Sequence, residues 1–322
     1  MSETILQIRD LDISFRTNAG CVHAIRGVNF ELRRGETVAI VGESGSGKSV
    51  TMKAAMGLLD SNATVNHGEI IYAYPDGHGG THPVDLLKLT RKQLRQTING
   101  QHIAMVFQDP MTSLDPTMQI GKQVMEGMIL HCGMSKQQAH DRALELLQLV
   151  GITDAEQRLK NYPHQFSGGQ RQRVGIARAL IMQPKLIIAD ECISALDVSI
   201  QAQVVNLMKD IQQETGCAYL FIAHDLSMVK YISDRIGVLH LGYMVEAGTK
   251  EEIFSHPVHP YTKSLLSAIP HPNPEVEKRR KSITYDYASS GIDYAKGMQH
   301  LVGGTHTVLA TDAELAQWTQ AE

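Results

Sequence analysis

Apolar residues recur with the spacing of strands at the start of the chain. Residues 4–15 and 22–32 alternate between apolar and polar side chains on either side of a polar turn at 17–20, which predicts two antiparallel strands. The run Val38-Ala39-Ile40-Val41 is apolar throughout, as expected of a strand that is buried on both faces. We therefore expect an antiparallel sheet ahead of a buried core strand.

Three later apolar runs share one feature: each is followed directly by polar side chains. The runs and the residues that follow them are 103–107 with Gln108, 186–189 with Asp190 and Glu191, and 218–223 with His224. The carboxyl ends of strands in an open parallel sheet meet at one edge, where such sheets bind ligands. The pattern therefore predicts that these polar groups face one cleft.

The middle of the chain has the period of helices. Residues 117–159 repeat apolar side chains at helical spacing, which predicts an all-helical insert between the strands. Its first helix carries Met118, Met125, Met128 and Met134, and methionine serves as core filler or as the lining of a partner-binding groove. Core filler is the commoner use, and we adopt that interpretation.

The segment between residues 60 and 101 has no strong motif. Residues 68–72 are predicted to form an edge strand and residues 74–83 a loop rich in Gly, Pro and Asp. The possible metal ligands in and beside this loop are Asp76, His78, His82 and Asp85. They include no ligand pair at a defining spacing, so we prefer a solvated surface loop to a metal site.

The chain beyond residue 270 is predicted to be an extension. Residues 270–274 form a stiff, proline-rich linker, and residues 275–281 form a charged run that we interpret as a solvated face. A weak helix is predicted near residues 312–318. These patterns assign no role to the tail.

One stretch carries specific chemistry. Gly42-Glu43-Ser44-Gly45-Ser46-Gly47-Lys48-Ser49 matches G-x-x-x-x-G-K-[ST] at every position, directly between an apolar run and a helix-like segment. Glycines allow backbone N–H groups to turn inward around a phosphate, and the following helix adds its positive end. Lys48 is expected to reach the β- and γ-phosphates of a nucleotide, and the Ser49 hydroxyl to hold Mg²⁺.

The polar residues at the strand ends fit the same chemistry. Two carboxylates at the tip of a buried strand are costly unless they meet a cation or a reacting water, so Asp190 is assigned to Mg²⁺ and Glu191 to the role of general base. Gln108 is a candidate contact for Mg²⁺ or the attacking water, and His224 for the γ-phosphate. Phe15 has two interpretations, an adenine-stacking aromatic and a core residue.

A second glycine-containing segment, Ser167-Gly168-Gly169-Gln170, opens a predicted helix and offers another helix N-terminus to an anion. Alone, such a segment is only an N-cap with a turn. Its place between the phosphate loop and the two carboxylates favours the anion-binding interpretation.

Composition narrows the class of protein. A chain of 322 residues is long enough for about two domains, and its hydrophobic and charged fractions, 43% and 20%, are typical of a soluble protein. No apolar run approaches the roughly 20 residues of a membrane-spanning helix, and the first residues lack the pattern of a secretory signal. Four scattered cysteines without a C-x-x-C pair indicate reduced thiols in a cytosolic compartment. The net charge of −4 argues against a broad electrostatic grip on nucleic acid.

Over residues 5–255 the chain resembles the nucleotide-binding subunit of ABC transporters. The motifs that carry the resemblance are, in order, GESGSGKS, Gln108, FSGGQ, LIIADE, SALD and His224. The segments DPMTSLDP, SALDVSIQAQV and HPYTKSLLSAIP resemble the ATPase subunits of oligopeptide and dipeptide permeases, a group that includes nickel importers. The phosphate loop resembles one of the two paralogous ATPases of these permeases and the later segments resemble the other, so the paralogue stays open.

The resemblance implies an α/β fold. We expect a P-loop NTPase core with a mostly parallel sheet, an antiparallel β subdomain and an inserted α-helical subdomain at about residues 109–183. The nucleotide-binding domain is expected at residues 1–255, and a C-terminal extension of the peptide-permease type at residues 256–322.

In that family, two subunits pair head to tail with ATP and Mg²⁺ between them, and the resemblance assigns roles by position. The nucleotide-binding residues are Phe15, Gly42, Glu43, Ser44, Gly45, Ser46, Gly47, Lys48, Ser49, Ser167, Gly168, Gly169, Gln170 and Asp197. The catalytic residues are Glu191, His224 and Gln108, and the metal ligands are Ser49, Gln108 and Asp190. Gln108 also couples the nucleotide site to the membrane partner.

The implied function is ATP hydrolysis that energises the import of oligopeptides or dipeptides, at the cytoplasmic face of the cell membrane. The implied partners are a second ATPase subunit, expected to be a non-identical paralogue, two transmembrane permease subunits that dock on the helical insert, and an extracytoplasmic substrate-binding protein. One alternative keeps this role with nickel or another solute as cargo. The other is a soluble ABC ATPase acting on nucleic acid or ribosomes, and the tandem nucleotide domains, long coiled coil or zinc-type cysteine pairs that would favour it do not occur in the sequence.

Two features depart from relatives. Cys192 stands where the family commonly has Pro, which restores a backbone N–H beside Glu191. We interpret it as a tolerated substitution rather than a functional thiol. Some relatives bind an iron–sulfur centre through cysteines in the extension, but no cysteine follows Cys217 and none is expected here.

Overall fold

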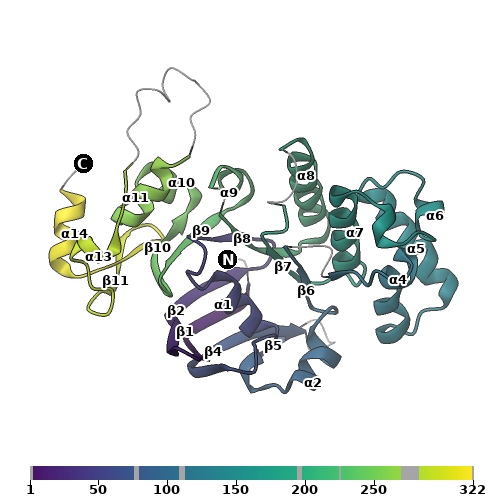
Figure 1. Ribbon diagram of the computed structural model, residues 1–322, viewed down its shortest axis with the longest axis horizontal. Coiled ribbons are helices and arrows are strands. Elements are labelled where there is room, and N and C mark those ends of the chain that lie inside the picture. The colour runs from purple at the N-terminus through teal and green to yellow at the C-terminus, as the bar shows by residue number, and fades with distance from the viewer. Residues whose placement is uncertain are drawn as a thin grey trace.

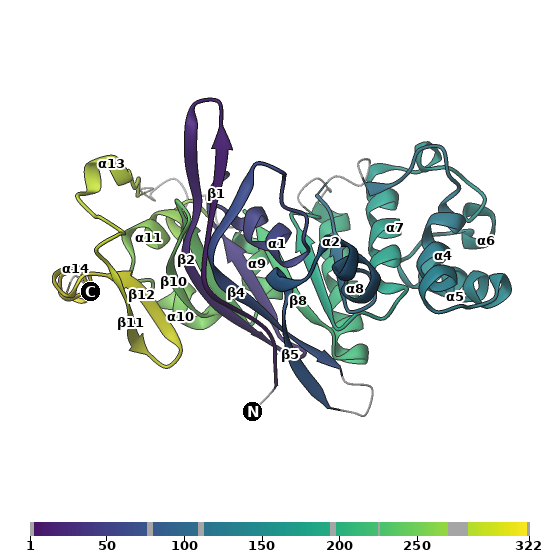
Figure 2. The same cartoon turned by 90° about the horizontal axis from the view of Figure 1, so that it is seen from below.

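The structure is a computed structural model in which two sheets occupy the centre, with a helical segment and the C-terminal extension at opposite ends (Figure 1, Figure 2). The residues that it describes are 3–75, 80–108, 113–193, 198–224, 226–269 and 283–320. The predicted α/β fold, with an antiparallel sheet beside a mostly parallel one, is confirmed.

The smaller sheet is antiparallel and has the order β2-β1-β4-β5. Its strands are β1 (Thr4–Thr17), β2 (Gly20–Arg33), β4 (Ala63–Pro75) and β5 (Thr81–Asp85). The two strands predicted at the start of the chain are therefore confirmed. We expected the whole sheet to precede the core strand in the sequence. This expectation is only partly correct, because β4 and β5 follow the phosphate loop.

Two expectations for this region are wrong. Residues 68–72 belong to β4, which lies between β1 and β5 and not at an edge, and the predicted loop 74–83 includes the end of β4 and the start of β5. The two strands form a hairpin in which Tyr74 pairs with His82, with ring centroids 5.3 Å apart. This cross-strand ring contact stabilises strand pairing despite the Gly and Pro content of the segment.

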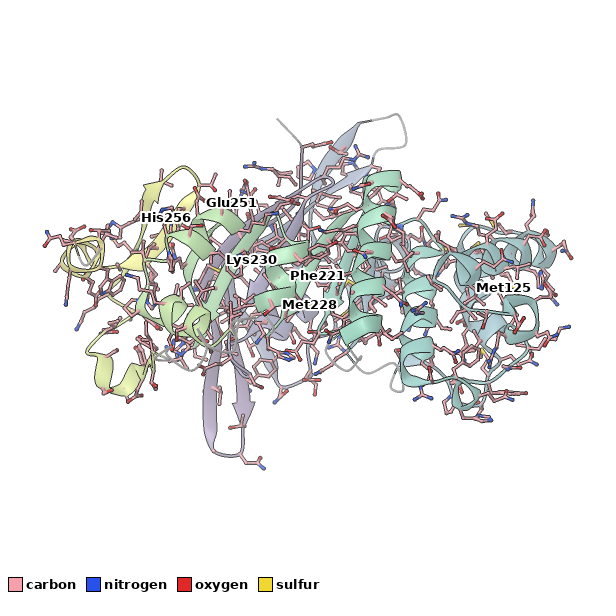
Figure 3. All side chains as sticks on the ribbon, turned by 90° about the horizontal axis from the view of Figure 1, so that it is seen from above. Met125, Phe221, Met228, Lys230, Glu251 and His256 are labelled. Carbon is pink, nitrogen blue, oxygen red and sulfur yellow. The ribbon has the colours of Figure 1, made fainter. Side chains whose placement is uncertain are left out.

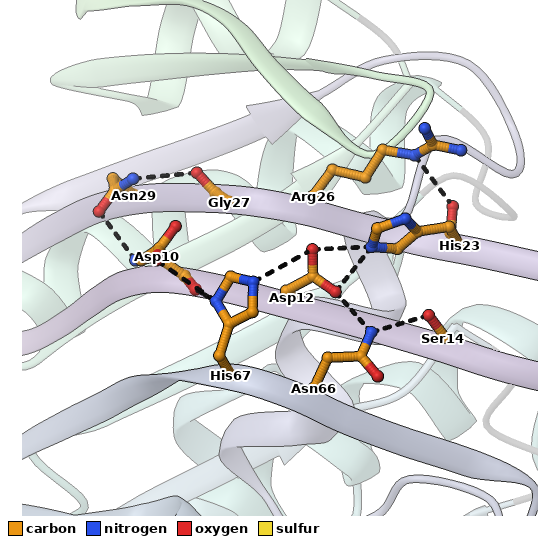
Figure 4. A network of polar contacts seen from close by, with 9 residues as sticks. All are labelled: Asp10, Asp12, Ser14, His23, Arg26, Gly27, Asn29, Asn66 and His67. Atoms are coloured by element: carbon orange, nitrogen blue, oxygen red, sulfur yellow. Dashed lines mark hydrogen bonds and ion pairs between the residues drawn. The ribbon is translucent and has the colours of Figure 1, made fainter. Parts of the chain in front are cut away.

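A polar network joins three strands of the smaller sheet (Figure 4). Asp12 of β1 is buried, with one carboxylate oxygen 2.6 Å from Nε2 of His23 on β2, and it accepts a hydrogen bond from Asn66 of β4. Burial opposes the charge on Asp12, but the hydrogen bonds from Asn66 and His23 outweigh it and lower the pKa of this carboxyl group. The network helps to fix the register of the strand that carries Phe15.

The larger sheet has the order β11-β12-β10-β9-β3-β8-β7-β6, and the strands from β9 to β6 are parallel. The strands β10, β12 and β11 are added antiparallel to one edge. The bounds are β3 (Thr37–Val41), β6 (Ile103–Val106), β7 (Leu186–Asp190), β8 (Ala218–Ala223), β9 (Arg235–His240), β10 (Tyr243–Thr249), β11 (Met298–Gly303) and β12 (His306–Ala310). All five residues of β3 are buried, as the sequence predicts.

Helices make up much of the rest of the described chain. Their bounds are α1 (Lys48–Ala55), α2 (Arg91–Gln93), α4 (Ile120–His131), α5 (Lys136–Leu149), α6 (Ala155–Arg158), α7 (Gly168–Leu180), α8 (Val198–Thr215), α9 (Leu226–Ile232), α10 (Lys250–Ser255), α11 (Pro260–Ser267), α13 (Tyr287–Ser290) and α14 (Asp312–Thr319). Short 3₁₀ turns occupy Leu86–Lys88 and Pro163–Gln165, and a π turn occupies Leu94–Ile98. Figure 3 shows Phe221 of β8, a core residue, near the middle of the molecule, and Met125 at the helical end.

The predicted helical insert is confirmed as α4 to α6. Ile120, Val124 and Met128 follow each other at i, i+4 spacing along α4, and all three are buried in the core. Met134, in contrast, has 40% of its surface exposed. The methionines of this region therefore serve partly as core filler, as we interpreted them.

The extension continues the larger sheet instead of forming a separate layer. Strand β12 pairs with β10, and β11 pairs with β12, so the sheet is continuous across residue 255, where the sequence predicts a domain boundary. A buried hydrogen bond joins the two strands, because His306 Nε2 lies 2.7 Å from Glu246 Oε1. Helix α14 was predicted from the sequence, whereas the two strands of the extension were not.

Candidate nucleotide-binding site

The phosphate loop leaves the central strand β3 and enters α1, as the motif requires. Gly42 has φ of 148°, and a Cβ there would lie 2.0 Å from the carbonyl oxygen of Leu239. Gly47 has φ of 106° and would place a Cβ 2.5 Å from Ile25 Cδ1. Only glycine fits these two positions, so the packing of β2 and β9 against the loop determines its curvature.

Inside this curve the loop presents polar groups that could hold phosphate. Ser46 is buried at 3% exposure, and its Oγ has no hydrogen-bond partner among the described residues. Ser44 and Gly45 are exposed at the mouth of the loop. A buried hydroxyl without a partner is costly, so a bound anion would supply what the fold leaves open. The loop therefore fits a nucleotide phosphate.

Lys48 lies at the start of α1 with its side chain turned back across the loop. Its Nζ donates to the carbonyl oxygens of Gly42 and Glu43, each at 2.8 Å. Burial lowers the pKa of Lys48, while the charges of Glu191, Asp190 and Glu43 oppose this shift. The lysine is thus a nearly buried cation, held where the sequence analysis places a phosphate contact.

Ser49 and Asp190 meet although they are 141 residues apart in the chain. The Ser49 hydroxyl donates to Asp190 Oδ1 at 3.0 Å. Burial raises the pKa of Asp190; the bond from Ser49 opposes this and the neighbouring Glu191 charge adds to it. A divalent cation would remove this strain on the ionised form, and hydroxyl and carboxylate oxygens are the ligands that Mg²⁺ prefers. These two residues therefore fit a magnesium ion.

Glu191 is the meeting point of three strand ends. Its Oε2 accepts a hydrogen bond from Gln108 Nε2 at 2.8 Å and lies 3.6 Å from His224 Nδ1. Gln108 follows β6, Glu191 follows β7 and His224 follows β8, so the predicted convergence at one sheet edge is confirmed for these residues. Glu191 has φ of 43°, a left-handed conformation that costs about 1–2 kcal/mol in a residue other than glycine. Its backbone N–H donates to Ile222 at 3.0 Å, which helps to hold this conformation.

Cys192 turns away from the site. Its side chain is 1% exposed and belongs to the main hydrophobic core. Burial raises the pKa of this thiol to about 12, so it stays protonated and unreactive at neutral pH. The packing supports its interpretation as a tolerated substitution.

The predicted residues are not all brought together within one chain. Ser167 caps α7, and its polar contacts close on Gln170, with Gln170 N donating to Ser167 Oγ at 3.2 Å. Ser167 and Gly168 are exposed to solvent. Asp197 lies outside the described residues. Phe15 is half-buried and packs against the smaller sheet's core, an arrangement compatible with both of its interpretations.

One contact to the phosphate loop was not predicted from the sequence. The hydroxyl of Tyr261 accepts a hydrogen bond from the backbone N–H of Glu43 at 2.9 Å, from a position 218 residues later. Tyr261 lies in HPYTKSLLSAIP, which we used only as a sign of the family. The His-Pro pair that starts α11 was the available signal, because proline at the first turn of a helix fixes where that helix begins.

Residues 25–194 of the chain match the ABC transporter family. The chain belongs to this family. Residues 245–291 also match the C-terminal region of oligopeptide/dipeptide transporters. This ABC protein is 51% identical to the oligopeptide transport ATP-binding protein OppD of Bacillus subtilis, over 83% of this chain and 72% of that protein. It is 46% identical to OppF of the same organism, over 98% of both chains.

Solved structures support the same assignment. The ABC chain superimposes on a dimeric ATP-binding cassette bound to ADP and phosphate with a TM-score of 0.66 and 27% identity, over 76% of this chain and 99% of that one. A cassette from a Clostridium perfringens ABC transporter complex gives a TM-score of 0.64 at 28% identity, over 79% and 92% of the two chains. These findings confirm the predicted family, fold and class of activity, that of an ABC ATPase. Within the described residues, no helix has both the length and the apolar character needed to cross a membrane.

Proposed function

We propose that this chain hydrolyses ATP to energise the import of oligopeptides or dipeptides through transmembrane subunits that other chains supply. One observation carries the proposal. The phosphate loop, the Ser49–Asp190 pair and Glu191 converge at one edge of the sheet, in a chain whose residues 245–291 match the C-terminal region of peptide transporters. Relatives with the names of oligopeptide and dipeptide transport ATP-binding proteins support the cargo class. Nickel or another solute is the second candidate cargo.

The described residues divide the chemistry between them. Backbone N–H groups of the phosphate loop and the Lys48 ammonium bind the phosphates, and Ser49 and Asp190 hold Mg²⁺, which would neutralise phosphate charge. Glu191 accepts a proton from the attacking water. Gln108 and His224 orient the Glu191 carboxylate from the two neighbouring strands. This division treats residues 1–255 as the nucleotide-binding domain and residues 256–322 as its extension.

The exposed Ser167–Gln170 segment acts on a second subunit. It forms the N-terminus of a 13-residue helix, where the Ser167 side chain accepts the Gln170 N–H. A helix N-terminus attracts anions, so this end is suited to the γ-phosphate bound on a facing subunit. We propose a head-to-tail pair with a non-identical paralogue, in which Asp197 also belongs to the interface. ATP then bridges the two subunits, and hydrolysis of the ATP allows the subunits to separate.

The proposed seat of the transmembrane subunits is the helical insert together with a cavity of about 450 Å³ between β6 and α7, the helix that packs against α4 and α5. The lining of the cavity includes Leu58, Phe107 and Arg178, and the first two are 43% and 40% exposed. Phe107 directly precedes Gln108, so a subunit seated here would act on the Gln108–Glu191 bond through one peptide link. The chain would work at the cytoplasmic face of the membrane, with an extracytoplasmic protein delivering substrate.

Reconstitution tests this function. The chain, its paralogue and the permease subunits are placed in vesicles that enclose MgATP, with the substrate-binding protein outside, and uptake of labelled peptides is compared with uptake of nickel. ATP-dependent peptide uptake supports the proposal, and nickel uptake alone supports the second cargo. Phe107→Asp is expected to abolish uptake, while Val22→Asp, at a position that is 53% exposed on β2, is the matched control. Recovery of the chain with ribosomes instead of membrane subunits would overturn the proposal.

A further inference from the structure

The C-terminal extension contacts the phosphate loop directly. The Tyr261 hydroxyl accepts the Glu43 N–H at 2.9 Å, and the tyrosine is 1% exposed. None of the residues assigned to nucleotide chemistry from the sequence lies in the extension. The contact therefore gives the extension a physical connection to the nucleotide site.

The peptide unit that Tyr261 holds is also held from its other side. The Gly42 carbonyl and the Glu43 N–H belong to one peptide group, and the carbonyl accepts from Lys48 Nζ at 2.8 Å while the N–H donates to Tyr261. Hydrogen bonds at both ends of a peptide group polarise it and strengthen one another. The same peptide group adjoins the Gly42 Cα, which packs so closely against the Leu239 backbone that no Cβ would fit there. Tyr261 thus helps to set the position of the peptide group against which Lys48 is aligned.

Two histidines hold Tyr261, one at its ring and one at its backbone. The His240 ring stacks on Tyr261 with a centroid distance of 3.9 Å and an interplanar angle of 22°. His259 caps α11, and its Nδ1 accepts the Tyr261 N–H at 3.1 Å. The stacked and buried ring has little freedom to swing its hydroxyl away from the loop, and the backbone bond fixes where the side chain starts.

Residues of β10 and of the rest of the extension hold those histidines. The buried Glu246 carboxylate accepts the N–H groups of Val258 and His259, at 2.7 and 3.0 Å, and pairs with His306 of β12. The hydroxyl of Tyr294 lies 2.7 Å from His240 Nδ1. The chain segments on both sides of α11 therefore determine where the Tyr261 hydroxyl lies.

We propose that Tyr261 is a positioning residue of the phosphate loop, and that through it the folding of the extension and nucleotide occupancy stabilise each other. The proposal rests on the nucleotide binding proposed above. Because coupling between two sites is reciprocal, an extension that favours the binding-competent loop must itself be stabilised when nucleotide binds. No chemical step is assigned to Tyr261.

The first test is Tyr261→Phe, which removes the hydroxyl and keeps the ring. Loss of one hydrogen bond to the loop is expected to raise the KM for MgATP and the Kd for MgADP about three- to tenfold, with kcat changed less than about twofold. Tyr285→Phe is the matched control, because it removes a hydroxyl of the same aromatic cluster that contacts Tyr294 and not the loop. Its KM is expected to equal that of the wild type.

The second test is hydrogen exchange in the wild-type chain with and without MgADP. Slower exchange of amides in α11 and β12 on binding is expected, and in Tyr261→Phe this slowing should disappear while that of α1 remains. If Tyr261→Phe only unfolded part of the protein, it would lower kcat and leave the KM for MgATP unchanged. That result would overturn the proposal. Unchanged KM and unchanged exchange in α11 would overturn it as well. If wild-type chain binds no MgADP at all, the proposed nucleotide function fails instead.

Discussion

Acidification from pH 7 to pH 5 is expected to destabilise the packing of the extension against β9, because His240 of β9 and His259 of the extension are buried there in the neutral form. Burial lowers the pKa of His240 to about 4, and burial with the nearby His240 charge lowers that of His259 to about 3. In the unfolded chain both values are about 6.5, so only the unfolded state takes up these protons at pH 5. The stabilisation is therefore complete above pH 6.5 and is lost progressively as the pH falls toward the native values.

The magnitude follows from linkage between proton binding and folding. Between pH 7 and pH 5, each histidine contributes a loss of about 2 kcal/mol to the free energy of unfolding, or about 4 kcal/mol for both. The pKa shifts can be converted into free energies in this way because both side chains are buried: His240 is 7% exposed and His259 is 0% exposed. A loss of this size is a large part of the roughly 5–15 kcal/mol that stabilises a typical domain.

The assay can use the single tryptophan of the chain as its reporter. The Trp318 ring meets His259 edge-on with a centroid distance of 5.0 Å, so its fluorescence should report unfolding of this cluster. Urea titrations at pH 7 and pH 5 then measure the change in stability. His259→Asn is the matched variant, because asparagine also caps helices but does not titrate, and it should remove about half of the pH dependence. An equal urea midpoint at both pH values, or a variant as pH-dependent as the wild type, would refute the reasoning.

Three further predictions concern the site. Lys48→Ala removes the buried cation of the phosphate loop and should weaken MgATP binding at least about tenfold by calorimetry; unchanged affinity would contradict the assigned role. Glu191→Gln should lower ATP hydrolysis by about 10²–10⁴-fold while MgATP still binds, and a wild-type rate would remove Glu191 from the role of general base. In native protein, a maleimide followed by mass spectrometry should label the exposed Cys21 and Cys132 but not the buried Cys192, whereas all three react in urea. Rapid native labelling of Cys192 would show that the turn beside Glu191 opens.

The sequence alone located those parts of the nucleotide-binding site whose chemistry depends on residues that are adjacent in the chain. Gly42 to Ser49 require a set order of glycines, lysine and serine around a phosphate, and that order is visible without a fold. The apolar runs that end at Gln108, Glu191 and His224 predicted one shared edge, because parallel strands align their carboxyl ends. The structure confirms this with the Gln108–Glu191 bond.

Only the tertiary structure decided which distant segments meet. The order of strands placed β4 inside its sheet and added β12 to β10, since pairing partners depend on contacts that no local pattern encodes. The bond from Glu43 to Tyr261 joins residues 218 positions apart, and it exists because β10 and α11 bring the extension back to the central strand. The identities of the loop residues were therefore readable from the sequence, while the support of that loop by the extension required the packed fold.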